Sequence, residues 1–294
     1  MFTGMLGQRA RQALAGTRFA DVRWVAETGS TNADVLERGR HGEPEGVVLV
    51  ADHQTAGRGR RGRTWEAPPG ASLLFSVLLR PPSQAVGATT MAAAVAAAGA
   101  VEDVAGFAPR LKWPNDLVVT GPAASTGGLV PENGTGPPLD RKLAGILAEA
   151  DWPAGSAISD GWRQPGPEER GVVVVGIGLN VNWPTDLPPE LAEIAVAANH
   201  LAGHDIDRED LLVALLRRFD RCYVDLVSGG AAARSVFDEW RSRSVTLGRR
   251  VRVELGPDDV EGTAVDVTAE GHLVVETEAG DRRSFAAGDV VHLR

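Results

Sequence analysis

The chain has 294 residues, 43% of them hydrophobic and 23% charged, a composition typical of a folded globular protein with room for more than one domain. Its formal net charge of -9 argues against a surface built for general nucleic-acid binding. The N-terminus has no apolar signal-peptide core, and the longest apolar run, residues 91–101, is too short to span a bilayer. We therefore expect a cytoplasmic protein with no membrane partner.

The first hundred residues predict three strands and two helices. A helix is expected to begin at Ser30 or Thr31 and to end at Gly42, because hydroxyl side chains favour helix starts and glycine favours helix ends. The segment 86–106 is apolar on most sides, which indicates a buried helix. The predicted strands are 22–28, 46–52 and 72–80.

The middle of the chain predicts further strands interrupted by two polar excursions. The strands are expected on either side of a Pro-Asn-Asp turn within 110–120, then at 142–150 and 172–182. The excursions, 121–140 and 151–170, are rich in glycine, proline and serine, and we interpret them as long, mobile loops. Helices are expected from about 190 to 243.

From Ser244 onward the pattern changes to short strands separated by Gly, Asp and Glu turns, which is typical of a small barrel. The sequence therefore predicts two domains, 1–243 and 244–294. The predicted fold class is α+β, with a central mixed or mostly antiparallel sheet that has helices on one face.

The stretch "GRGRRGR", residues 57–63, allows two interpretations. Its glycines match the G-x-G-x-x-G pattern of a dinucleotide-binding turn, which also requires a helix that begins in the turn and an acidic residue about 20 positions later. The chain instead continues "TWEAPPGAS", and no acidic residue lies at the required distance. We therefore set the dinucleotide interpretation aside.

The alternative interpretation of this arginine loop is an anion site. Four guanidinium groups in seven residues match phosphate or carboxylate oxygens, and the glycines let the backbone approach a ligand. Because like charges repel, we expect the loop to be disordered until an anion neutralises it. A solvated basic loop without a ligand stays open on composition alone.

Five segments in this order resemble the biotin–protein ligases. They are "ETGSTN" at 27–32, "DHQTAGRGRRGRTW" at 52–65, "KWPNDL" at 112–117, "KLAGIL" at 142–147 and "GIGLNVN" at 176–182. The resemblance implies a class II synthetase-like catalytic domain and an SH3-like C-terminal barrel. The first motif begins at Glu27, and 26 preceding residues are too few for the DNA-binding domain that some relatives carry, so no DNA partner is expected.

The family's reaction has two steps. The carboxylate of biotin attacks the α-phosphate of ATP to form biotinyl-5′-AMP, and a lysine of a biotin carboxyl carrier protein domain, in an acyl-CoA or pyruvate carboxylase, then takes the biotin. The resemblance implies ATP and Mg²⁺ as cofactors, since an anion attacking an anion needs cations around it. The carrier protein, the order of substrate binding, the role of the excursions and the choice between monomer and homodimer stay open.

The resemblance assigns the biotin side of the site residue by residue. Lys142, Arg58 and Arg60 are the expected catalytic residues. The expected biotin contacts are Ser30, Thr31, Asn32, Gln54, Arg58 and Gly145. A plain helix N-cap is the alternative for the Ser-Thr-Asn stretch, and a solvated surface charge is the alternative for Lys142.

The nucleotide side is assigned in the same way. The expected nucleotide contacts are Arg60, Arg63, Trp65, Lys112, Asn115, Asp116 and Asn180, and Asp116 is the expected magnesium ligand. The alternative role for Trp65 is that of an aromatic residue in the core. The alternative for Asn115 and Asp116 is a turn between strands. Arg61 receives no role and is expected to face solvent.

Two rival functions stay in view. A lipoate–protein ligase belongs to the same superfamily but is not expected to carry the arginine loop. A non-catalytic anion or nucleic-acid binder would use the same loop without binding biotin, and its affinity would fall steeply with salt.

Overall fold

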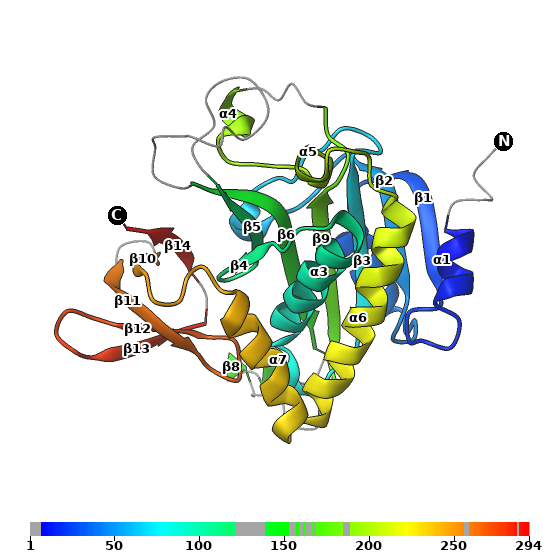
Figure 1. Cartoon of the computed structure of the whole chain (residues 1–294). Coiled ribbons are helices and arrows are strands. Elements are labelled where there is room, and N and C mark those ends of the chain that lie inside the picture. The colour runs from blue at the N-terminus through cyan, green and yellow to red at the C-terminus, as the bar shows by residue number, and fades with distance from the viewer. Residues whose placement is uncertain are drawn as a thin grey trace.

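The computed structural model describes residues 7–121, 139–152, 157–158, 161–162, 166, 169–184, 189–255, 259–286 and 288–293. Its centre is a seven-stranded mixed sheet, and a smaller antiparallel sheet lies at the C-terminal end (Figure 1). The α+β fold class predicted from the sequence is confirmed.

The central sheet has the strand order β1-β2-β3-β9-β6-β5-β4. The β1 and β2 strands are parallel, and every other neighbouring pair is antiparallel. The bounds are β1 Val22–Thr28, β2 Val48–Gln54, β3 Ser72–Leu79, β4 Arg110–Lys112, β5 Asp116–Gly121, β6 Leu139–Asp151 and β9 Val172–Asn180. The order places β9, β6 and β5 side by side, so the motifs at 176–182, 142–147 and 112–117 become neighbours in the sheet.

Two long helices cover one face of this sheet (Figure 1). The α3 helix, Thr89–Ala105, is buried along most of its length and packs on α6, Arg208–Ser228, which confirms the buried helix predicted from its apolar sequence. Alanine dominates α3, so the partner helix and the sheet can approach closely. The α7 helix, Gly230–Arg243, packs against both. The remaining helices are α1 Gln8–Ala13, α4 Pro189–Ala192 and α5 Ala198–Ala202.

The opposite face of the sheet carries α2, Thr31–Arg40, a point that the predicted arrangement with helices on one face missed. Alternation along β9 explains the two faces, because successive side chains point to opposite sides. Val173 and Val175 belong to the core under α3, whereas Val172 and Val174 pack with Val35 of α2 in a second, smaller core. The α2 helix is short, so part of this face stays open beyond its N-terminus.

The segment 244–293, which we call the C-terminal barrel after its predicted fold, contains the five strands β10 Arg250–Glu254, β11 Val260–Val267, β12 Leu273–Glu276, β13 Arg282–Phe285 and β14 Asp289–His292. These strands form an antiparallel sheet of order β13-β12-β11-β10-β14. The barrel is attached by hydrogen bonds that Trp113 makes: its backbone N–H donates to Thr246 Oγ1 at 3.1 Å, and its indole donates to the carbonyl of Gly271 at 3.0 Å.

A polar cluster also joins the barrel to the central sheet. Asp140 of β6 accepts from Thr120 at 2.7 Å and lies 3.1 Å from Arg249 and 3.0 Å from His292, both in the barrel. Burial by itself would raise the pKa of Asp140, but hydrogen bonds from His292 and Thr120 and the charge of Arg249 lower it from 3.8 to about 2. The cluster therefore favours the ionised carboxylate in the folded protein.

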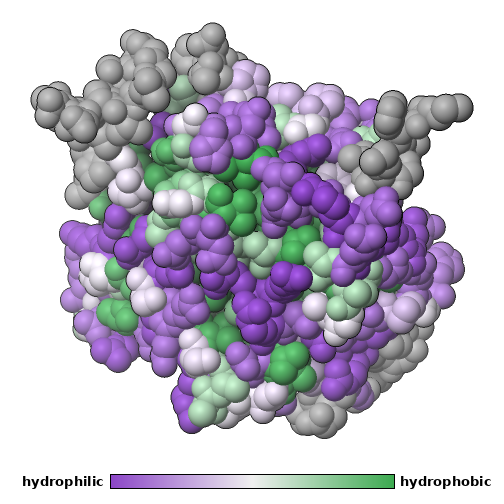
Figure 2. Space-filling view, turned by 45° about the vertical axis from the view of Figure 1, so that its right-hand side comes forward, coloured by the Kyte–Doolittle hydropathy of each residue, from purple (hydrophilic) through white to green (hydrophobic). Residues whose placement is uncertain are grey.

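The predicted excursions lie largely outside the described residues; the described part includes two short strands, β7 Ala157–Ile158 and β8 Gly161–Trp162. Among the described helices none is long and apolar enough to cross a membrane. On the face drawn in Figure 2, hydrophilic residues cover most of the surface, and hydrophobic residues form smaller areas between them.

Replacing Asp140 by Asn tests the polar cluster. We expect the free energy of unfolding near neutral pH to fall by about 1.5–3 kcal/mol, the usual value of a lost hydrogen bond to a charged group. Because the folded-state pKa is depressed, the stabilisation is complete above the unfolded value of 3.8 and is lost as the pH falls through about 2. Urea unfolding across this pH range measures the difference between the two proteins.

The exposed Asp281→Asn variant serves as the matched control in the same barrel, since surface carboxylates contribute little. A gap between wild type and Asp140→Asn that persists unchanged into strong acid would contradict this account.

Candidate functional site

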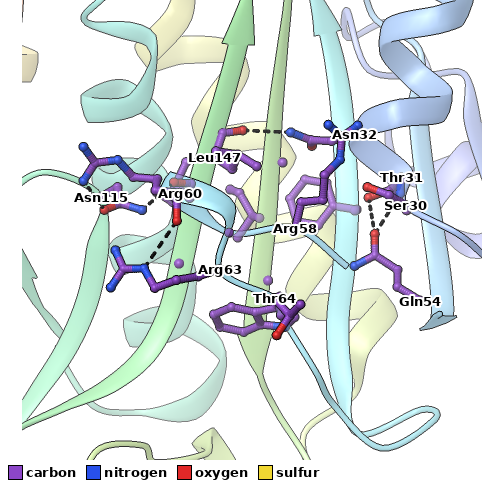
Figure 3. A pocket seen from close by; sticks show the side chains of 18 of the residues that line it. Ser30, Thr31, Asn32, Gln54, Arg58, Arg60, Arg63, Thr64, Asn115 and Leu147 are labelled. Carbon is purple, nitrogen blue, oxygen red and sulfur yellow. Dashed lines mark hydrogen bonds between the residues drawn. The ribbon is translucent and has the colours of Figure 1, made fainter. Parts of the chain in front are cut away.

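A cavity opens on the sheet face beyond the N-terminus of α2, between that helix and the arginine loop (Figure 3). The cavity has a volume of about 120 Å³ and opens to solvent on one side. Its lining residues are Ser30, Thr31, Asn32, Gln54, Arg58, Gly59, Arg60, Arg63, Thr64, Trp65, Phe75, Asn115, Lys142, Gly145, Ile146, Leu147, Gly176, Ile177 and Gly178.

The start of α2 forms one end of the cavity. Ser30 is the N-cap, and its hydroxyl accepts from the backbone N–H of Ala33 at 3.5 Å, so the plain N-cap role exists alongside a place in the cavity wall. Gln54 Oε1 accepts from the Thr31 backbone N–H at 2.7 Å and from the Thr31 hydroxyl at 3.0 Å. The hydrogen bonds hold the amide of Gln54 at the helix start.

Asn32 is fixed by three hydrogen bonds to strands β6 and β3. Its Nδ2 donates to the carbonyl of Leu147 at 3.2 Å and to Glu149 at 2.9 Å, and its Oδ1 accepts from the buried hydroxyl of Ser76 at 2.6 Å. The Ser76 hydroxyl also lies 2.7 Å from Thr31 Oγ1. Donors and acceptors are therefore already aligned, which gives this end of the cavity a rigid hydrogen-bonding pattern.

Glycines of β6 and β9 form the floor. A Cβ at Gly176 would lie 1.9 Å from Asn32 Oδ1, and a Cβ at Gly178 would lie 2.6 Å from the indole of Trp65. A Cβ at Gly145 would lie 3.0 Å from both Trp65 and the side chain of Lys142. Only glycine lets these side chains lie directly on the sheet.

Lys142 and Trp65 line the middle of the cavity together. The Lys142 ammonium lies 5.5 Å from the centre of the indole ring and 2.7 Å from Asp116 Oδ1. The lysine side chain is 36% exposed, so it is an ion-paired group at the rim of the cavity. The buried Nε1 of Trp65 makes no hydrogen bond within the described part of the chain, so a ligand acceptor could satisfy it.

The arginine loop lies along the cavity, and its expected disorder without an anion stays a prediction. Arg60–Gly62 form one short 3₁₀ turn, and no α-helix begins in residues 57–71, so the dinucleotide interpretation fails. Carboxylates of the protein neutralise the loop: Glu149 lies 3.2 Å from Arg58, and Asp289 lies 3.0 Å from Arg63.

Arg60 lies deepest of the four loop arginines. Its side chain is 18% exposed, and its guanidinium group donates to Asn115 Oδ1 at 3.4 Å and to the carbonyl of Gly288 at 3.2 Å. Burial lowers the pKa of Arg60, partly offset by the charges of Asp289 and Asp116. A group so poorly solvated gains most from a bound anion.

Most of the residues predicted from the sequence meet in this one cavity. Lys142, the start of α2, Gln54, Gly145, Asn115, Trp65 and the arginines at 58, 60 and 63 all line it. Asp116 does not line the cavity and is connected to it only by its ion pair with Lys142. Lys112 lies on β4 opposite Asp116, away from the lining, and Asn180 is 3% exposed, with its Nδ2 donating to the carbonyl of Val196 at 3.2 Å.

Four further residues belong to the site but were not among the expected site residues. Ser76 and Glu149 hold Asn32, and Gly176 and Gly178 make room on the floor. Gly176 and Gly178 lie in the "GIGLNVN" motif, whose glycines favour close backbone approach, whereas the signals for Ser76 and Glu149 were only a serine within an apolar strand and an acid at the end of another. Neither signal identifies a partner before the strands are paired.

The described residues contain no group of three or more His, Cys, Asp or Glu side chains placed to hold a metal ion. Asp116 is already paired with Lys142, so it can supply one oxygen at most while keeping that partner close. The donor set fits a magnesium ion that arrives with other oxygen ligands of its own.

The fold and cavity together define an α+β protein with a site for a small polar ligand and a cationic wall for an anion. Residues 25–152 match the model of the "Biotin/lipoate A/B protein ligase family", and residues 246–293 match "Biotin protein ligase C terminal domain". The chain belongs to the biotin protein ligase family.

Named relatives agree with the match. The chain is 37% identical over 288 residues to the biotin–[acetyl-CoA-carboxylase] ligase of Mycobacterium tuberculosis, covering 95% of this chain and 92% of that one. It is 32% identical to the bifunctional ligase/repressor BirA of Bacillus subtilis, covering 88% and 70%. The biotin protein ligase of Aquifex aeolicus in complex with biotin and ATP superposes with a TM-score of 0.69 at 25% identity, covering 94% and 100%.

Gly176→Ala tests whether the floor needs glycine. The added methyl group would collide with Asn32 Oδ1, which is held by Ser76, so we expect a loss of about 1–3 kcal/mol in the free energy of unfolding, as for overpacked cores. Chemical denaturation measures the loss. Gly121→Ala is the control, because its nearest contact, at 3.7 Å, leaves room for a methyl group. Equal stability of the two variants would contradict a close-packed slot.

Proposed function

We propose that this chain is an ATP-dependent ligase that joins biotin to AMP and then transfers the biotin to a lysine of a carrier protein. The M. tuberculosis relative, named as a biotin–[acetyl-CoA-carboxylase] ligase, aligns over almost the whole of both chains, and the similar A. aeolicus structure is a complex with biotin and ATP. The cofactors are ATP and Mg²⁺, with biotin as substrate.

One observation carries the proposal: a fixed hydrogen-bonding end and a cationic wall share a single cavity. The ureido group of biotin needs both donors and acceptors, which Ser30, Thr31 and Asn32 supply at the start of α2. The carboxylate at the other end of biotin needs cations, which the arginine loop and Lys142 supply. The glycine floor lets a flat ring lie against the sheet.

In the first step, an oxygen of the biotin carboxylate attacks the α-phosphorus of ATP, and the bond to pyrophosphate breaks. Two anions must approach each other, so Arg58, Arg60 and Lys142 hold the carboxylate and the phosphate together and stabilise the charge on the transferring group. Cations held in place before reaction contribute more than mobile ones, because they need no reorganisation.

In the second step, the amine of the carrier lysine attacks the carbonyl carbon of the mixed anhydride, AMP leaves, and the amine loses a proton. The anhydride must be protected from water until then. The loop from Gly57 to Arg63, which already lies along the cavity, supplies that cover. Gln54 and Gly145 complete the biotin side of the site.

We assign the nucleotide to the side of Lys142 and Asn115. Magnesium neutralises the phosphates of the leaving group when bound, and Asp116 is the protein carboxylate proposed to hold it. Arg63 and Trp65 line the same wall, and Lys112 and Asn180 stay nucleotide contacts by resemblance only, since neither lines the cavity in this structure.

The domain division and the partners are proposals as well. We assign catalysis to 1–243 and propose 244–294 as a separate barrel, because α7 ends at Arg243.

The carrier is a biotin carboxyl carrier protein domain of a carboxylase. We expect no DNA binding by this chain, and residues 7–21 support this expectation because they form one short helix, which packs against α6.

Lys142→Gln tests the site. We expect adenylate formation to fall about 100-fold or more, as when one preorganised charge is removed from a transition state, while the fold is retained. The rate of biotin-dependent pyrophosphate release from ATP, with Mg²⁺, measures the first step. Transfer to a purified carrier domain measures the second.

The chain has two lysines, Lys112 and Lys142. Since Lys112 is itself an expected nucleotide contact, the control is Arg234→Gln, which removes a positive charge from the exposed side of α7 and should leave the rate close to that of the wild type. Wild-type protein that releases pyrophosphate with lipoate in place of biotin, or with neither, would refute the proposed substrate.

A further inference from the structure

A chain of polar side chains runs from the wall of the cavity into the core of the sheet. Ser76 of β3 is 0% exposed and does not line the cavity, yet its hydroxyl oxygen lies 2.7 Å from Thr31 Oγ1 and 2.6 Å from Asn32 Oδ1. Thr31 Oγ1 in turn lies 3.0 Å from Gln54 Oε1 (Figure 3). Three contacts therefore join four oxygen atoms.

The amide groups at the two ends of this chain contribute oxygen atoms to it, not hydrogens. Asn32 Nδ2 donates to the carboxylate of Glu149 at 2.9 Å, so Oδ1 is the atom that faces Ser76. Gln54 Oε1 accepts from the backbone N–H of Thr31 at 2.7 Å, which fixes the orientation of that amide as well. The hydroxyl groups of Ser76 and Thr31 carry one hydrogen each, so two hydrogens serve three contacts.

One of the three contacts therefore always lacks a hydrogen bond. The contact between Ser76 and Asn32 is the shortest, and an amide oxygen can only accept, so the hydrogen of Ser76 is assigned to Asn32. The hydrogen of Thr31 has two destinations, Gln54 Oε1 at 3.0 Å and Ser76 Oγ at 2.7 Å. Rotation of the hydroxyl about its C–O bond exchanges them, and no covalent bond breaks.

The direction of the Thr31 hydroxyl decides whether Gln54 can accept from a ligand. An amide oxygen has two lone pairs, and Thr31 fills both of them on Gln54 when its backbone N–H and its hydroxyl donate together. When the hydroxyl donates to Ser76 instead, one lone pair of Gln54 becomes free, and Gln54 lines the cavity. A cyclic urea such as the ureido group of biotin carries two N–H donors, which need acceptors of this kind.

We propose that Ser76 is a positioning residue that takes over the hydrogen bond of Thr31 when the ureido group binds. This inference rests on the proposed function. An N–H of the ureido group donates to Gln54 Oε1, and the displaced Thr31 hydroxyl turns to Ser76 Oγ. Ser76 continues to donate to Asn32, so every hydroxyl hydrogen of the chain stays paired in the complex.

Ser76→Ala removes the acceptor that the displaced hydroxyl needs. The ureido N–H then competes with the Thr31 hydroxyl for Gln54, and we expect the Kd of biotin to rise about fivefold, the factor of one net hydrogen bond. Calorimetric titration of biotin into the full-length protein measures this Kd. Desthiobiotin, which keeps the ureido group but lacks the sulfur ring, should lose the same factor.

A second variant separates this role from a purely structural one. Thr31→Val has no hydroxyl hydrogen to displace, so adding Ser76→Ala to it should change the Kd of biotin less than about twofold, as a double-mutant cycle measures. Ser76→Cys is the third variant. Its thiol is a weaker acceptor than a hydroxyl, so its Kd should lie between those of the wild type and Ser76→Ala, and it answers the same question should Ser76→Ala fail to fold.

Ser72→Ala is the matched control, because Ser72 is also a 0% exposed serine of β3 and lies four residues away, on the same face of the strand. Its hydroxyl accepts from the indole of Trp183 at 2.9 Å, and it does not line the cavity. Losing this hydroxyl should lower the free energy of unfolding without changing the Kd of biotin.

An unchanged Kd in both Ser76→Ala and Ser76→Cys overturns the inference. A fivefold rise that persists in the Thr31→Val background, or that is confined to biotin and spares desthiobiotin, also overturns it. In each of these cases a wild type that binds biotin leaves the proposed function intact. A wild type that does not bind biotin overturns the proposed function and this inference with it.

Discussion

The site depends on the absence of side chains at Gly176 and Gly178, in the middle of a sheet that is otherwise filled with valine, leucine and isoleucine. At these two positions Asn32 and Trp65 lie where a Cβ would be. Ordinary β-branched residues would pack α2 and the loop away from the strands and close the cavity. The glycines therefore convert a packed sheet face into a floor on which a flat ligand can lie.

The second constraint is the mutual repulsion of the positive charges around the cavity. Carboxylates of the protein offset this repulsion. Four guanidinium groups within seven residues repel one another, and Glu149 and Asp289 lie beside them and offset part of this repulsion. Asp116 offsets the positive charge of Lys142 in the same way, through an ion pair. A binding site for an anion has to exist before the anion arrives, and acids from the protein stabilise the cations during that time.

The strand order explains why segments far apart in the chain act together. Because β9 lies between β3 and β6, Ser76, Gly176 and Leu147 become neighbours, and Asn32 contacts all three across the sheet. The barrel adds a contact from the far end of the chain, since Asp289 reaches the loop between β2 and β3. The site thus couples the N-terminal motif, the loop and the last strand.

The sequence by itself determined the fold class, the buried α3 helix, the strands around the arginine loop and most residues of the cavity, because each has a local signal: periodicity, a capping residue or a glycine- and arginine-rich motif. The tertiary structure alone decided the partners. A buried serine, an acid at a strand end and an acid in a separate barrel carry no local signal, since their roles come from register and from the approach of distant strands. For the same reason α2 was not expected on the second face, Asn180 proved to be packed against Val196, and Arg61, which was expected to face solvent, donates to the carbonyl of Glu254 in the barrel.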